Sequence, residues 1–195
     1  MDPIELECVS LDRTNLSGRI LSGIRLDQCR LTQVDLSGSE LPQALLQDVV
    51  VSGGTFANVR TKELRLRRAA FSGVRMTGVD FSWAALEDVS FTDCRIDLGA
   101  FQNVKLTRVL FEGCRLDEVD FSGAQLVSVT FSRCLLVRSL WTDATLTQSE
   151  MRDSDISGAG NPERLRGVRM PWPDVLASAA VFATALGVEI VEEAE

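Results

Sequence analysis

The chain is 195 residues long, 45% of them hydrophobic, and its 28 acidic and 20 basic residues give a net charge of −8. This hydrophobic content excludes general disorder, and the length suits one elongated domain with a short appendage. Histidine is absent, which removes the commonest general base and metal ligand and every Ser–His or Cys–His nucleophile pair. Neither of the common glycine-rich phosphate-binding motifs occurs. We therefore expect no enzyme activity, no metal and no cofactor.

Membrane and export signals are also missing. No apolar run reaches eighteen residues, and residues 1–5 lack the basic start of a signal peptide. We expect a cytoplasmic protein that does not contact a membrane. The cysteines form no CxxC pair, and Cys94, Cys114 and Cys134 recur every twenty residues. In a reducing compartment this pattern favours small core residues over a disulfide.

A five-residue period dominates residues 4–159. From Leu6 to Ile156 a large apolar residue returns at every fifth position, and of these 31 positions only Thr61 is polar. Neither an α-helix, with a period of 3.6, nor a plain strand, with a period of 2, produces this spacing. Fixed self-similarity predicts a repeat architecture in which neighbouring units stack to bury a common core. We assign residues 1–159 to this domain.

Each repeat has the same internal chemistry. A small or β-branched residue stands two positions before the large apolar one, and Ser or Thr usually follows it, as in Val119-Asp120-Phe121-Ser122-Gly123. This resembles the pentapeptide-repeat family. The resemblance implies an all-β solenoid, a right-handed quadrilateral β-helix of about eight coils with one pentapeptide on each side.

The columns of the repeat indicate four sides. At a twenty-residue turn, one column from Leu6 to Leu146 is entirely leucine. A coil of ten residues also fits the aromatic residues, but the cysteines above, and likewise Arg75, Arg95 and Arg115, recur at twenty and not at ten. Four sides is therefore the better interpretation. The aromatic residues form the predicted core ladder: Phe71, Phe81, Phe91, Phe101, Phe111, Phe121, Phe131 and Trp141.

Basic residues gather in residues 60–75. This basic band comprises Arg60, Lys62, Arg65, Arg67, Arg68 and Arg75, against the single acid Glu63. It is either a solvated positive surface or a docking surface for an acidic partner or nucleic acid. Exposed aromatic residues do not alternate with these bases, so we expect no direct binding of nucleic acid. The five-residue period places Trp83 on the outside.

The repeat ends at residue 159. We expect a linker over 160–173, a helix from an N-cap at Asp174 to Leu186, a stop at Gly187 and a short strand at Val188–Val191. This 174–195 segment would cap the open end of the coil. It carries more apolar surface than a thin cap needs, so the alternatives are a cap alone or a cap that also joins two copies. The predicted dimer interface is Trp172, Val175, Leu176, Ala179, Phe182, Ala183, Leu186, Val188 and Ile190.

Negative charge is concentrated towards the C-terminus. Residues 143–195 contain ten acidic and four basic residues, a net −6 of the total −8. Eight coils about 4.8 Å apart make a rod about 38 Å long, and two rods joined end to end approach the length of a short DNA duplex. The predicted DNA-mimicking acidic surface is Asp97, Asp117, Glu118, Asp120, Asp143, Asp153, Asp155 and Glu163.

Coils without an inserted loop, followed by a helix, a glycine and an apolar segment, resemble the MfpA and Qnr class of quinolone-resistance proteins. That resemblance implies a homodimeric rod that binds DNA gyrase or topoisomerase IV and protects it against topoisomerase poisons, as antibiotic resistance or self-immunity. Fold alone does not determine function. The alternative is a structural or regulatory rod that binds another protein.

Overall fold

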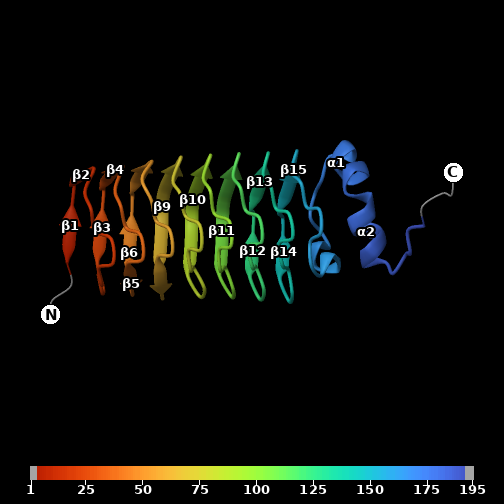
Figure 1. The fold of residues 1–195 in the computed structure, drawn as a ribbon, viewed down its shortest axis with the longest axis horizontal. Coiled ribbons are helices and arrows are strands. Elements are labelled where there is room, and N and C mark those ends of the chain that lie inside the picture. The colour runs from red at the N-terminus through yellow and green to blue at the C-terminus, as the bar shows by residue number, and fades with distance from the viewer. Residues whose placement is uncertain (1–3, 192–195) are drawn as a thin grey trace.

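The structure, a computed structural model, describes residues 4–191 and shows a straight solenoid of short parallel strands (Figure 1). The strands are β1 (Glu5–Glu7), β2 (Ser10–Asp12), β3 (Arg25–Asp27), β4 (Arg30–Thr32), β5 (Glu40–Pro42), β6 (Leu45–Gln47), β7 (Val50–Ser52), β8 (Arg60–Lys62), β9 (Arg65–Ser72), β10 (Ala85–Thr92), β11 (Lys105–Glu112), β12 (Gln125–Val127), β13 (Thr130–Ser132), β14 (Thr145–Thr147) and β15 (Glu150–Arg152). The remaining elements are η1 (Pro162–Leu165), α1 (Trp172–Ala177) and α2 (Ala179–Ala185).

Strand pairing confirms the predicted four-sided β-helix. Along the first turn, successive sides pair with the next turn at Leu6–Leu26, Leu11–Leu31, Asn15–Asp35 and Ile20–Glu40. Every pair of strands is parallel and separated by twenty residues, so one coil takes four pentapeptides. The longest path through the sheet, β1-β3-β6-β9-β10-β11-β12-β14, holds eight strands and therefore seven full turns.

Each corner of the coil requires a left-handed backbone. The residue two positions after the large apolar one has a positive φ, for example 69° at Gly78 and 63° at Trp83. Glycine adopts this conformation without steric cost, whereas a side chain there carries strain. The corner also pushes its side chain out of the coil, which is why Trp83 is 70% exposed, as predicted.

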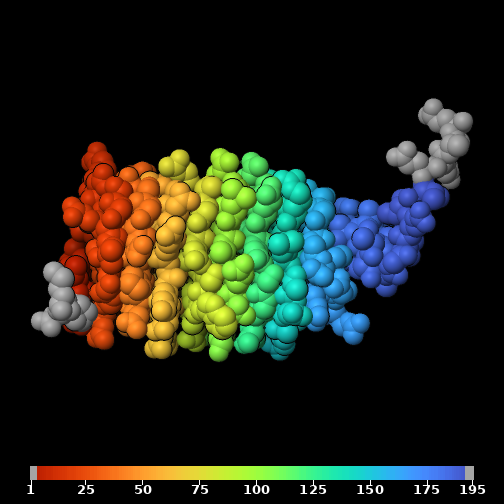
Figure 2. All heavy atoms as spheres, turned by 60° about the horizontal axis from the view of Figure 1, so that its bottom comes forward, coloured from red at the N-terminus to blue at the C-terminus, as the bar shows by residue number. Residues whose placement is uncertain are grey.

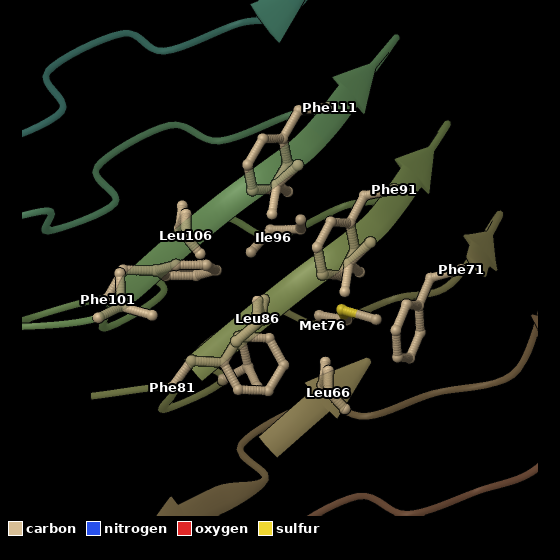
Figure 3. Close-up of a cluster of buried hydrophobic side chains, with 14 of the residues drawn as sticks. Leu66, Phe71, Met76, Phe81, Leu86, Phe91, Ile96, Phe101, Leu106 and Phe111 are labelled. Atoms are coloured by element: carbon tan, nitrogen blue, oxygen red, sulfur yellow. The ribbon is translucent and has the colours of Figure 1, made fainter. Parts of the chain in front are cut away.

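The aromatic core ladder is confirmed (Figure 3). Rings of Phe71, Phe91 and Phe111 stack with centroids 5.0 Å apart, in planes within 14° of parallel. The facing column packs Phe81 against Phe101 at 5.3 Å, edge to face. Both are favourable aromatic geometries, so each coil braces its neighbours along the axis.

Thr61, the one polar residue in the register, is buried, and its hydroxyl donates a hydrogen bond of 2.8 Å to the carbonyl oxygen of Asp80. The coil is locally irregular at Gly53-Gly54, where two successive residues have a positive φ. At Gly54 a Cβ atom would lie 2.3 Å from the carbonyl oxygen of Val34, so only glycine lets the two coils approach.

Residues 160–173 continue the coil part of the way instead of forming a free linker. Leu165 in η1 is buried under the last full turn, and Arg169 forms a parallel bridge with Glu150. The amide of Arg169 donates to Ser149, and its carbonyl accepts from Met151, both at 3.0 Å. This incomplete coil covers the edge that β15 would otherwise leave open.

The C-terminal segment differs from the prediction in three places. The helix begins at Trp172, not after an N-cap at Asp174, because Pro173 suits the first turn, where its missing N–H is no loss. It then breaks at Ser178, whose ψ of 9° interrupts the helical path and turns α2 towards η1. No strand forms at Val188–Val191, where no neighbouring strand is available to pair with it.

The predicted stop at Gly187 is confirmed. Gly187 has a φ of 73°, its amide donates to Thr184 and the amide of Val188 donates to Ala183. These two bonds satisfy carbonyls at the helix end, the arrangement that favours glycine at this position. In Figure 2 the helices extend from the rod end as a narrower body. Neither described helix is long enough to cross a bilayer.

Candidate protein interface

Half of the predicted acidic surface is neutralised by arginine. Asp97 is buried between Arg95 and Arg115, with nitrogen–oxygen distances of 2.6 and 3.2 Å. Asp117 pairs with Arg115 at 2.8 Å. This ladder of alternating charges offsets the repulsion between the stacked arginines and removes these carboxylates from any surface that imitates DNA.

Two further predicted acids are paired across the corners. Glu118 lies 2.5 Å from Arg138, and Asp143 lies 2.9 Å from Arg164 of η1. The bond to Glu118 raises the pKa of Arg138 above its usual range. Both pairs are solvent-exposed, so each contributes little to the stability of the fold. Each pair nevertheless carries no net charge, so it adds nothing to a negative surface.

The other predicted acids remain free of arginine and lysine. In the described chain no basic group lies within ion-pair distance of Asp120, Asp153, Asp155 or Glu163, and three of them are in the last coil or η1. Asp155 accepts hydrogen bonds from the hydroxyl and amide of Ser157. Within the predicted acidic surface, the carboxylates without a basic partner therefore lie mostly at the C-terminal end of the rod.

The predicted dimer residues divide into two sets. Phe182 packs against the core, and Val175 in α1 and Ala183 in α2 are half-buried. The carboxylate of Asp174 accepts the backbone N–H of Asp153 at 2.8 Å, which docks α1 on the last coil. These residues cap the rod.

The second set faces outwards. Exposed fractions are 70% for Trp172, 58% for Leu176 and 81% for Leu186. Ala179, Val188 and Ile190 are also exposed. Large exposed apolar side chains gathered at one end of a rod are typical of a contact surface. That a second copy of the chain covers these side chains stays a prediction.

The basic band is only partly neutralised. Arg68 pairs with Asp48 at 2.7 Å and Arg67 with Glu87 at 3.4 Å, whereas Arg60, Lys62 and Arg65 have no acidic partner among residues 4–191. Hydrogen bonding to Arg68 holds the pKa of Asp48 below its usual value.

A hollow beside Trp83 was not predicted from the sequence. Its volume is about 490 Å³, and Ala85 lies between Arg65 and Lys105 in one column of its wall. Lys105 joins the basic band there although it is forty residues beyond Arg65. The twenty-residue spacing was the signal that could have found it.

Sequence comparison identifies one family over nearly the whole repeat. The pentapeptide repeat region matches residues 52–121 and 84–160, and eight copies of the pentapeptide repeat match residues 10–48. No curated protein matches the chain significantly.

Solved structures with a similar fold have low sequence identity. A trypsin-treated variant of QnrB1, a plasmid-mediated fluoroquinolone resistance protein, is 16% identical, with 96% of this chain and 100% of that chain covered and a TM-score of 0.47. HetL from Nostoc sp. strain PCC 7120, involved in heterocyst differentiation regulation, is 20% identical, with 87% and 90% covered and a TM-score of 0.35. Rfr23 from Cyanothece 51142 is 16% identical, with 72% and 90% covered and a TM-score of 0.46. At these scores the neighbours say nothing about what this chain binds.

Proposed function

The chain belongs to the pentapeptide-repeat family, and from that premise we propose that it is a non-enzymatic, DNA-mimicking rod that binds a type II topoisomerase, DNA gyrase or topoisomerase IV. By occupying the groove that holds DNA, it would protect the enzyme against poisons such as fluoroquinolones. We also propose that it acts in the cytoplasm, where its target works.

The observation that carries this proposal is the coincidence of two features at one end of a stiff rod. The exposed apolar residues Trp172, Leu176 and Leu186 and the unpaired acids Asp153 and Asp155 lie at the same end. Two copies joined there would form a double rod whose centre is negative. Seven turns about 4.8 Å apart give about 34 Å per copy, so the double rod would have the length of a short duplex.

Charge placement makes this function depend on the dimer. The mid-rod acids Asp97, Asp117 and Glu118 are neutralised, which leaves Asp120 as the one mid-rod acid of the predicted surface without a basic partner. Joining two copies doubles the free carboxylates at one place, and attraction between that place and a basic groove would speed association.

The test is DNA supercoiling by purified gyrase with and without a fluoroquinolone. We expect the parent protein to reduce drug-trapped DNA cleavage at micromolar concentration. The double variant Asp153→Asn, Asp155→Asn should protect less well, whereas Glu118→Gln, which alters an acid already paired with arginine, should protect like the parent. Unchanged supercoiling and unchanged cleavage with the parent protein would rule the proposal out.

The dimer is tested separately by sedimentation. Leu186→Asp changes a residue that is 81% exposed and should yield a monomer with intact coils. Phe182→Asp is a poor choice because Phe182 also packs against the core. Leu98→Asp, at an exposed corner of the rod, is the matched control and should sediment like the parent. Equal masses for all three proteins would mean that α1 and α2 only cap the rod.

The hollow beside Trp83 favours a second candidate, a regulatory rod that binds an acidic peptide. Arg65, Lys105 and the exposed indole of Trp83 line it, so a carboxylate could pair with a cation while apolar atoms cover the ring. Titration of a glutamate-rich peptide should quench Trp83 fluorescence in a Trp172→Phe background, and the double variant Arg65→Glu, Lys105→Glu should not respond. No quenching in either protein would remove this candidate.

A further inference from the structure

The N-terminal coils surround an apolar space on the axis of the rod. It measures about 190 Å³, and its walls run from Ile4 in the first coil to Phe56 in the third. The other contributors are mostly leucines from all four sides of the coil, including Leu16, Leu26 and Leu31. No polar atom contributes to the exposed surface of this space.

Its origin lies in a mismatch between coil size and side-chain size. Every coil has the same cross-section because every strand pair is separated by twenty residues. From Phe71 onwards two facing columns fill that cross-section with aromatic rings (Figure 3). In the first two coils the same columns hold leucine, which is smaller, so the centre remains unfilled.

The space opens towards the N-terminal end of the rod. Leu6, Leu11, Leu16 and Leu21 in the first coil are half-buried, whereas Leu26 and Leu31 directly beneath are buried. At the rim Ile4 is 49% exposed. The described coils therefore leave a route along the axis that needs no break in the backbone ladder.

We propose that this N-terminal lumen is a binding site for a small, uncharged apolar molecule, of the size of a benzene ring or a short alkyl chain. An engineered cavity of about 150 Å³ with leucine, isoleucine and phenylalanine walls stays free of water and binds benzene or xenon. The lumen has the same chemistry and a similar size. Thr14 is the one polar residue in its lining, and the hydroxyl of Thr14 already donates to the carbonyl oxygen of Asp12 at 3.2 Å, so the lumen selects against ligands with a polar group. The site lies at the opposite end from α1 and α2 and is independent of the proposed function.

The test uses benzene, phenol and xenon as probes of the whole chain. Benzene should raise the melting temperature in a saturable manner, and phenol should bind at least tenfold more weakly because its hydroxyl would be buried without a partner. Xenon under pressure should give electron density inside the first two coils of a crystal.

Two variants separate the lumen from the surface. Leu31→Phe places a ring in the column that Phe71, Phe91 and Phe111 continue, so it should fill the space and abolish the benzene effect. Leu135→Phe makes the same change at a residue that is 44% exposed, and this variant should show the same benzene effect as the parent. An equal response of Leu31→Phe and the parent, or no benzene effect and no xenon in the parent, overturns the proposal.

Discussion

Truncation of Phe111 to alanine tests the aromatic ladder where it is most complete. The side chain in β11 is fully buried, and its ring stacks on those of Phe91 and Phe131, with both centroids 5.0 Å away. The ring of Phe101 meets it edge to face at 6.4 Å. Burial and the cavity left behind make a Phe→Ala change cost about 3–5 kcal/mol. Loss of two stacked contacts, each worth about 0.5–1.5 kcal/mol, puts the expected cost near the upper end.

Urea unfolding measures this cost. Far-UV circular dichroism reports the coils, and the fluorescence of Trp141 reports the core, because its indole is buried against Phe121 at 4.5 Å. Trp83 and Trp172 should first be changed to phenylalanine so that Trp141 is the only tryptophan. The two transitions must coincide before a free energy is taken from them.

Leu16→Ala is the control. Leu16 belongs to the half-buried first coil and borders the N-terminal lumen, so its truncation adds to a space that already exists and should cost less than about 2 kcal/mol. A cost for Phe111→Ala within 1 kcal/mol of this control would refute the view that stacked rings hold the coils together.

Three further changes have expected outcomes. Gly54→Ala should lower the free energy of unfolding by about 3 kcal/mol, because its Cβ meets a backbone carbonyl of the preceding coil at 2.3 Å, whereas Gly38→Ala, with open space around it, should cost about 1 kcal/mol; denaturation midpoints compare them. Leu31→Phe should raise stability by about 0.5–2 kcal/mol by filling the lumen, and a lower melting temperature would contradict this. The hydroxyl and amide of Ser37 hold the pKa of Asp35 below its usual value, so the stability they add is present above about pH 4 and lost as pH falls through the folded-state pKa. Ser37→Ala should flatten that loss, as measured by urea midpoints from pH 7 to pH 2.

Most of the fold was predictable because the repeat is locally redundant. A period of five, maintained from Leu6 to Ile156, assigns every residue to the inside, the outside or a corner before any contact is known. The twenty-residue recurrence of Cys94, Cys114 and Cys134 then indicated four sides, and every strand pair in the structure follows it.

The C-terminal segment was less predictable because it does not repeat. Its helical pattern was recognised, and so was the stop at Gly187. The residues at which the helix starts and breaks, and the way it docks on the last coil, depend on contacts with the rod. One such contact is the hydrogen bond from the amide of Asp153 to the carboxylate of Asp174. One continuous helix was expected, but the break at Ser178 sends Phe182 towards the core and leaves Leu176 in solvent.

The sequence by itself determined the coil, its register and its aromatic core, since these follow from a side-chain period that every repeat restates. Only the tertiary structure decided which acidic side chains lack a basic partner and where the core is left unfilled. Asp97 is neutralised by Arg115, eighteen residues away and one coil on, and the lumen exists because coils of constant size meet side chains of unequal volume. Both are properties of residues that stacking brings together, and no stretch of chain contains them alone.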